Sequence, residues 1–446
     1  MTSDLRLAAP QPDRRGVVRA AVWNQLLWTA GYPLTSGGFL LYFASDLGAR
    51  GFLTSLLLAL PELVGVGAVF TRPLIVAAGH RKRVWGVCGV LARVTSLAIP
   101  LMAFPALRPS GEGALWFLVG ALAVSQILQA ISYVAYLSWL SDLVPEERWG
   151  RFFAMRNIAR LAVMLLVPVA VGVARDRWVR GLPTETALIA YVVAWGAGTA
   201  LQLASMVPLL KLPDSRSEID GMSSSTVISA PLPEVSATSW SQPGYGASLT
   251  LLIVHNLWLA FSNGLTQAAF FDYRKNVLGI SLATYYILEN TTTLVMIPVS
   301  VAAGRISDRT GNKWLLFWGA MIAAGAMPFW LMASPAHWTL VFGAQVCWGA
   351  FAAVNLAGGN LLLKLSPRSA NTLQLALFQQ GAGLLAGLSG LLGGWWLQRM
   401  VPQSVHFAGW SWNAHQIVFL ASFAGRLTAP LWVLPIREPP PHETTV

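Results

Sequence analysis

The chain has 446 residues, of which 55% are hydrophobic and only 11% are charged. Soluble domains carry about 25% charged residues, so this composition excludes a water-soluble protein and indicates one that crosses a membrane many times. The net charge of +11 does not indicate nucleic acid as a partner, because the basic residues are scattered over short loops. Cys88 and Cys347 lie in separate apolar runs without ligand spacing, so we predict no disulfide, metal site or cofactor.

The first half of the chain, 1–210, opens with a polar, arginine-bearing segment up to Ala20 that does not read as a cleavable signal. Apolar runs then recur, each long enough to cross a hydrocarbon layer of about 30 Å at 1.5 Å per residue. We predict helices at 20–44, 52–74, 84–107, 114–140, 153–174 and 186–210.

A Ser- and Pro-rich stretch at 211–247 has little apolar periodicity and is predicted to be a cytoplasmic linker. The predicted fold class is an all-α polytopic membrane protein, with about twelve transmembrane helices in two six-helix pseudo-symmetric halves. The second half, 248–446, supplies the remaining runs, at 248–271, 280–303, 314–334, 337–363, 371–398 and 412–435.

The orientation follows from the Lys and Arg residues of the short loops, which concentrate on the cytoplasmic side. Placing the N-terminus in the cytoplasm puts most of the 30 basic residues in inside segments. Both termini are therefore predicted to be cytoplasmic, in a bacterial cytoplasmic (inner) membrane. One outer loop resists this rule, because it contains Arg175, Arg177 and Arg180.

The two halves repeat each other. The charged segment GRISDRTGNK, Gly304 to Lys313, has a degraded copy in RPLIVAAGHRKR, Arg72 to Arg83, and each lies between two apolar runs. Asn24 is matched by Asn256, and Leu47-Gly48 is matched by Leu278-Gly279. A polar segment at 145–157 has its counterpart at 367–379. Parallel repeats of this kind are one of the main transporter architectures.

With these motifs the sequence resembles the major facilitator superfamily over nearly its whole length. The resemblance implies a secondary transporter whose loop pattern GxxxDRxGxK follows the second helix of each half. The first copy departs from this pattern, because Val76 stands where the acidic residue should be. In the family that acid holds a helix end and the basic loop residues in the outward-facing state, so a latch here would depend mainly on the second copy.

The loop residues are predicted to form a conformational gate. Glycines permit a turn and close helix approach, and an aspartate can cap a helix or pair with an arginine. The alternative is a polar turn whose charges only fix the topology. The candidate gate residues are Gly304, Asp308, Arg309, Gly311 and Lys313 in the second copy, and Arg81 and Arg83 in the first.

Four charged residues fall inside predicted helices, where a charge costs roughly 2.5–3.5 kcal/mol on insertion scales. Glu62 and Glu289 lie on adjacent turns of equivalent helix faces and are candidate proton carriers. Arg426 interrupts the last apolar run and could pair with Glu289 or with an anionic substrate. The alternative is that these groups are structural, which we favour for Arg93 near the inner end of its helix.

A midplane binding site should be lined by polar, mostly uncharged groups from the first, fourth, seventh and tenth helices. The same stripes could equally be hydrogen bonds between helices, and a lone histidine more often packs than relays protons. The candidates for substrate contact are Asn24, Gln25, Gln126, Gln129, Tyr133, His255, Asn256, Asn263 and Gln267.

The function predicted is secondary active transport of a small solute by alternating access, with proton coupling. The alternative is a non-transporting membrane sensor or scaffold of the same fold. An enzyme is not predicted, because no nucleophile or metal constellation is evident and the six histidines are scattered. The expected partners are a small-molecule substrate and the lipid bilayer, with the protein acting as a monomer and binding no nucleic acid.

Overall fold

The computed structural model describes residues 14–64, 70–143, 149–214, 245–366, 371–401, 403–407 and 410–438. The polar segments at 145–157 and 367–379 and the linker at 211–247 therefore fall partly outside the described residues. By its internal contacts the chain divides into two compact units, one of 1–47 with 64–228 and one of 48–63 with 229–446.

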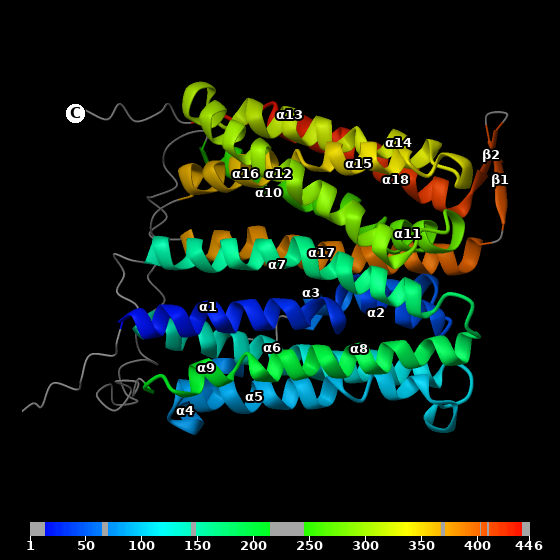
Figure 1. Ribbon diagram of the computed structural model, residues 1–446. Coiled ribbons are helices and arrows are strands. Elements are labelled where there is room, and N and C mark those ends of the chain that lie inside the picture. Colours follow the sequence, from blue (N-terminus) through cyan, green and yellow to red (C-terminus); the bar gives the residue numbers. More distant parts are fainter. Residues whose placement is uncertain are drawn as a thin grey trace, which may run out of the picture. The chain divides into compact units, whose positions relative to one another are not determined.

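The first unit is helical throughout its described residues (Figure 1). Three short segments, η1, η3 and η4, are 3₁₀-helices that each contain a proline near their start. Its elements are α1 (Arg14–Gly31), η1 (Tyr32–Leu34), α2 (Gly37–Asp46), α4 (Thr71–Ala78), α5 (Arg81–Ser96), η3 (Pro100–Ala103), η4 (Pro105–Leu107), α6 (Gly113–Leu143), α7 (Trp149–Trp178), α8 (Thr184–Ala204) and α9 (Val207–Leu210).

The second unit takes in α3 (Gly51–Val64) up to Leu63, together with the rest of the chain. Several of its long runs are broken, and η8 is one turn of π-helix. Its other elements are α10 (Tyr245–Gly264), α11 (Gln267–Asp272), η8 (Tyr273–Val277), α12 (Leu282–Thr310), α13 (Lys313–Ala324), α14 (Ala326–Met332), η9 (Pro335–His337), α15 (Leu340–Trp348), α16 (Phe351–Leu365), α17 (Asn371–Met400), β1 (Ser404–Phe407), β2 (Trp410–Asn413), α18 (Ala414–Thr428) and η10 (Ala429–Val433).

The prediction of an all-helical chain misses one feature, the antiparallel pair β1–β2 between α17 and α18 (Figure 1). Both strands are rich in β-branched or aromatic residues that alternate with polar ones, which favours strand pairing. Asn413 ends the second strand and caps α18, since its side chain accepts a hydrogen bond from the Gln416 N–H while Gln416 returns one to the Asn413 backbone.

Nine helical segments within the described ranges are long and apolar enough to cross a membrane. The chain is therefore mostly helical and is an integral membrane protein. Helices also occupy the predicted first, second and eleventh positions, as α1 with α2, as α3 with α4, and as α17. The total of twelve spans, in two halves meeting at a linker, stays a prediction.

Two pairs of glycines agree with the predicted duplication. Gly79 and Gly311 occupy matching positions in the two copies of the charged loop, and their φ angles are +69° and +83°. Gly48 and Gly279 end the matched Leu-Gly pairs, with φ angles of +99° and +66°. Side chains rarely adopt this left-handed region, so the same turn is required at both copies.

Arg175, one of the arginines on the wrong side by the charge rule, is neutralised locally. Its Nη2 lies 2.7 Å from Oδ2 of Asp46, and its Nη1 lies 3.2 Å from Oδ1 of Asp176. Tyr191 donates a 2.6 Å hydrogen bond to the same Asp46 oxygen, and its ring lies 5.3 Å from the guanidinium. Arg175 therefore lies in the last turn of α7 and not, as predicted, in the loop after it, and its pairing leaves little net charge at this helix end.

In the second unit, α17 packs closely on two neighbours because its contact faces are glycine-rich. A Cβ on Gly393 would collide with the backbone oxygen of Leu265, on the connection after α10. A Cβ on Gly394 would collide with Ser55 of α3. From the other side, a Cβ on Gly264 of α10 would collide with the backbone oxygen of Ala386. Small residues of this kind let helix backbones approach within a membrane.

We predict that Gly264→Ala destabilises the protein by about 1–3 kcal/mol, because the added methyl group meets backbone that cannot rotate away. The measurement is the thermal unfolding midpoint of the detergent-solubilised protein. Gly359→Ala is the matched control, since a Cβ at this helical glycine has no neighbour within 4 Å. Equal midpoints for the two variants would contradict the packing argument.

Candidate functional site

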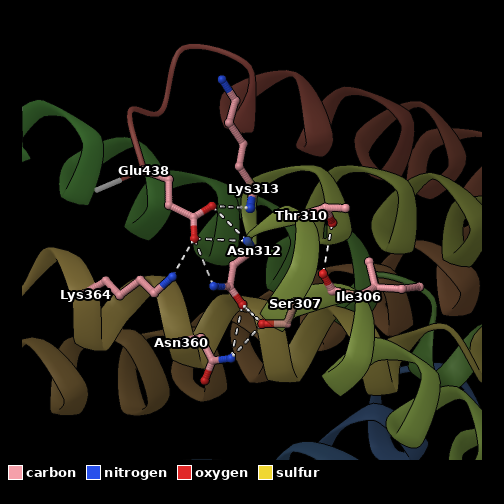
Figure 2. Close-up of polar contacts among 8 residues, drawn as sticks. All are labelled: Ile306, Ser307, Thr310, Asn312, Lys313, Asn360, Lys364 and Glu438. Carbon is pink, nitrogen blue, oxygen red and sulfur yellow. Dashed lines mark hydrogen bonds and ion pairs between the residues drawn. The ribbon is translucent and has the colours of Figure 1, made fainter. Parts of the chain in front are cut away.

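The predicted gate motif, Gly304 to Lys313, covers the last turns of α12, the short connection at Gly311 and Asn312, and the first residue of α13. A glutamate from after the last helix binds this connection (Figure 2). Glu438 accepts hydrogen bonds from the backbone N–H of Asn312, at 2.8 and 3.0 Å, and of Lys313, at 2.8 Å. The Asn312 side chain donates a further bond of 2.9 Å, and Lys364 of α16 forms an ion pair at 2.8 Å. The carboxylate thus joins the start of α13, α16 and the C-terminal segment.

The electrostatics of this contact favour the ionised carboxylate. Burial acts to raise the pKa of Glu438, but hydrogen bonds from Lys364, Asn312 and the backbone N–H groups outweigh it and lower the pKa below its usual value. The start of a helix also carries partial positive charge, which stabilises an anion there. The carboxylate therefore acts as the cap of α13.

A second layer of hydrogen bonds fixes the loop beneath the carboxylate (Figure 2). The Ser307 hydroxyl donates to Oδ1 of Asn312 at 2.6 Å. Asn360 of α16 donates to the same oxygen at 3.1 Å and to the Ser307 hydroxyl at 3.3 Å. Because Asn312 is held on both sides, the loop is a rigid part of the second unit.

The motif residues occupy different roles from those predicted. Gly311 forms the turn, and Lys313 contributes its backbone N–H. Asp308 and Arg309 are exposed, and the structure gives Asp308 no hydrogen bond or ion pair within the part of the chain that it describes. Gly304 lies on α12 with open space around it. A gating role for Asp308 stays a prediction.

The matching loop of the first unit binds backbone carbonyls in place of a carboxylate. Lys82 donates to the carbonyl oxygens of Leu210, at 2.8 Å, and Leu212, at 2.6 Å, at the end of α9. Arg81 donates to the Ser138 carbonyl of α6 at 3.2 Å, whereas Arg83 is exposed. In each unit, the segment after the last helix is thus attached to the charged loop.

Glu289 forms an ion pair with an arginine that the sequence analysis did not single out. The Oε1 atom of Glu289 on α12 lies 2.6 Å from Nη1 of Arg274 in the π-helical turn η8. Arg274 is 7% exposed, and its guanidinium lies 4.6 Å from the ring centre of Tyr285 and 5.6 Å from that of Trp330. The suggested pairing of Glu289 with Arg426 is therefore replaced by a pairing with Arg274.

Glu62 lies at the contact between α3 and α17. A Cβ on Gly383 would stand 2.5 Å from the Oε2 atom of Glu62, so the carboxylate rests on a glycine backbone. The residue as a whole is exposed. Glu289 is exposed as well, although its carboxylate is paired with Arg274.

Arg426 is buried near the middle of its span, Ala414–Val433, and is 3% exposed. Its Nε donates to the Ser422 hydroxyl at 3.0 Å, and its Nη2 donates to the Thr266 hydroxyl at 3.3 Å. The ring centres of Phe270 and Trp348 each lie 5.8 Å from the guanidinium carbon. In the described part of the second unit no carboxylate contacts this guanidinium.

Two of the substrate candidates in the first unit hold helices together. Asn24 donates to the Ser205 carbonyl at 2.8 Å and accepts from the Tyr136 hydroxyl at 3.2 Å. Gln25 accepts a 2.8 Å bond from Arg156 of α7, whose guanidinium lies 5.3 Å from the Tyr136 ring. These bonds fit the alternative in which Asn24 and Gln25 join helices to one another instead of contacting substrate.

The three candidates on α6 are more open. Gln129 accepts a bond of 3.3 Å from the buried Arg93, which also donates to the Gly89 carbonyl. Gln126 is half-buried, and Tyr133 is 53% exposed. The structural role favoured for Arg93 agrees with these contacts.

The candidates on the seventh predicted helix divide in the same way. His255 is 2% exposed and bonds through Nδ1 to the Ala429 carbonyl at 2.8 Å, and Asn256 donates to the Phe378 carbonyl of α17 at 2.7 Å. The Oδ1 atom of Asn263 is buried without a partner among the described residues, and Gln267 is half-buried. Asn263 and Gln267 therefore keep polar groups free for a ligand.

The sequence analysis missed Glu438, Arg274 and Arg156. Glu438 lies beyond the last apolar run, where nothing in the sequence pairs it with a loop more than 120 residues away. Arg274 lies at the end of a run and reads as a loop charge, because a π-helical turn has no pattern of its own in the sequence. Arg156 could have been noticed, since it falls inside the fifth predicted helix.

Residues 246–445 match the family model of the Major Facilitator Superfamily. No curated protein matches the chain in sequence.

Solved transporters share the fold over almost the whole chain. The nucleoside transporter NupG, in the form of a point mutant, is 13% identical with a TM-score of 0.64, covering 95% of this chain and 100% of its own. A D-xylose-proton symporter is 16% identical with a TM-score of 0.65, covering 95% and 97%. The peptide transporter POT, also a point mutant, is 14% identical with a TM-score of 0.63, covering 94% and 93%.

These likenesses show that the chain has the fold of membrane transporters. The resemblance to the major facilitator superfamily carried by GRISDRTGNK is supported by the family-model match to residues 246–445, and the chain as a whole shares the fold of these solved transporters.

We predict that Glu438→Gln lowers the stability of the solubilised protein at neutral pH by on the order of 1–3 kcal/mol, because it weakens charge-assisted bonds. A lowered pKa in the folded state means that the carboxylate stabilises the fold above its unfolded pKa of about 4.3 and loses this effect as pH falls through the folded value. The unfolding midpoints of wild type and variant should therefore converge in acid.

Asp308→Asn is the matched control, and it should leave the midpoint unchanged because Asp308 is exposed. If instead Asp308→Asn destabilises the protein while Glu438→Gln does not, Asp308 and not Glu438 would be the acid that caps α13.

Proposed function

We propose that this protein is a secondary active transporter that moves a small solute by alternating access, driven by protons. The observation that carries the proposal is the Glu289–Arg274 ion pair within membrane-spanning helices. Ionisable side chains are expensive at this depth and mark substrate or proton pathways. The side chain of Glu289 is 46% exposed, so a proton can reach it.

Proton coupling follows from the chemistry of that pair. A proton on Glu289 removes the negative charge that holds Arg274, and loss of the proton restores the pair. Arg274 packs on Tyr285 of α12 and Trp330 of α14, so release of the guanidinium alters contacts with two helices. Glu62 is the second candidate carrier, since its carboxylate is accessible and contacts α17 at Gly383.

The loop contact of Glu438 supports a cytoplasmic gate. It connects α13, α16 and the segment after η10, and its bonds are of a reversible, charge-assisted kind. We propose that Asp308, Arg309 and the basic residues Arg81 and Arg83 take part in a different state of the transport cycle. We also propose that the protein lies in the inner membrane of a bacterium, with both termini in the cytoplasm. In this proposal it is a monomer built of two six-helix halves.

We predict that Glu289→Gln abolishes gradient-driven transport, because the amide can neither release nor take up a proton. The measurement is uptake into proteoliposomes with and without a pH gradient, using a nucleoside, D-xylose and a dipeptide as first probes. Glu62→Gln is tested in the same way, and Glu112→Gln, an exposed carboxylate before α6, is the matched control.

Gradient-driven uptake that survives in both Glu289→Gln and Glu62→Gln would overturn the proton-carrier assignment. A wild-type protein that moves no solute under any condition would contradict transport itself and favour a sensor or scaffold of the same fold.

A further inference from the structure

No carboxylate contacts the buried guanidinium of Arg426 among the described residues. Arg175 contacts two carboxylates, and Arg274 contacts Glu289. Arg93 has a backbone carbonyl and an amide oxygen as acceptors. Arg426 has only two hydroxyl groups and two aromatic faces within the described residues.

The two hydroxyls cannot neutralise this charge. Ser422 donates its own proton to the Ser262 carbonyl at 2.6 Å, and Thr266 donates to the Asn263 carbonyl at 3.1 Å. Each therefore offers Arg426 a lone pair and no negative charge. Removing a guanidinium from water is costly, and contact with an aromatic face offsets only part of that cost. An anion is the partner that this position lacks.

Hydrogen-bond donors without partners gather in the same cluster. The indole N–H groups of Trp348 and Trp330 and the side-chain NH₂ of Gln345 are buried and have no acceptor among the described residues. The two tryptophan rings lie 5.9 Å apart, and Gln345 precedes Trp348 by one helical turn. The Thr292 hydroxyl donates to the side-chain oxygen of Gln345, so the NH₂ group of Gln345 is the part of the amide that has no partner among the described residues. Donors of this kind bind the oxygens of an oxyanion.

The ring cluster also indicates the charge and the body of the ligand. The ring of Trp330 lies beside Arg274, which is paired with the Glu289 carboxylate. The ring of Trp348 lies beside Arg426, which has no carboxylate partner among the described residues. One unpaired guanidinium balances one negative charge, which fits a carboxylate better than a doubly charged phosphate. The surrounding faces of Phe270 and the two tryptophans suit a flat apolar group.

We propose that Arg426 binds the carboxylate of a monoanionic organic solute with a flat apolar body, and that this class of solute is the cargo. The inference rests on the proposed transport function. Trp348 and Gln345 donate to the carboxylate beside Arg426, and the aromatic rings contact the body of the solute.

The test is binding of benzoate to the full-length solubilised protein. Binding is measured as the shift of the thermal unfolding midpoint. Benzoate should raise the midpoint, whereas benzamide, which has the same shape without the charge, should not. Arg426→Gln should weaken benzoate binding on the order of tenfold or more, because a charge-assisted bond is lost. Trp348→Phe keeps an aromatic ring but removes the N–H donor, so it should weaken benzoate binding less than Arg426→Gln does. Trp318→Phe, on the exposed face of α13, is the matched control for Trp348→Phe.

If benzoate raises the unfolding midpoint of Arg426→Gln as much as that of wild type, the proposal is overturned. It is also overturned if inorganic phosphate raises the midpoint of wild type and neither benzoate nor phenylacetate does. If Arg426→Gln does not fold, Arg426→Lys and Trp348→Phe decide the matter by their benzoate affinities, and unchanged affinity in both would overturn the proposal. Proton-driven movement of a neutral solute without benzoate binding would refute this site and leave transport intact. Benzoate binding through Arg426 without flux of any solute would refute transport and leave the site intact.

Discussion

Hydrocarbon offers an ionised side chain no water, so each charge within the membrane must find a partner inside the protein. This constraint accounts for most of the specific contacts in both units. Arg175 finds Asp46, Arg274 finds Glu289, and Arg156 finds the amide of Gln25. Arg426 has no such partner among the described residues, and it is there that we place the solute carboxylate.

The two charged loops, which we predict to be copies of one repeat, make similar contacts with different chemistry. In both loops a glycine with a positive φ angle ends the helix before the loop. The helix after the loop, α5 or α13, is bound at its start by the segment at the end of the unit's last helix. The first unit attaches through Lys82 and main-chain carbonyls, and the second through the Glu438 carboxylate. Only the second contact can be broken by a proton or by a competing anion, so the two ends of the repeat differ in how they can be controlled.

The sequence was sufficient for the family resemblance, the helical membrane fold and the positions of the long spans, because apolar length and loop charge are local properties. It did not predict the breaks at Gly325 and Gly349, the π-helical turn at Arg274 or the strand pair after α17. These depend on contacts with distant helices. The site was harder still, since Asn24 and Asn256 read as equivalent polar groups yet bind unrelated carbonyls. Glu438 could not be recognised, because its partners are 125 and 126 residues away.

That separation bears on how the protein is made. The N–H groups of Asn312 and Lys313 emerge from the ribosome well before the carboxylate that satisfies them, and α14 to α18 must be inserted in between. Until then water has to solvate the start of α13. The connection between α12 and α13 therefore gains its Glu438 contacts only after these later helices have been made.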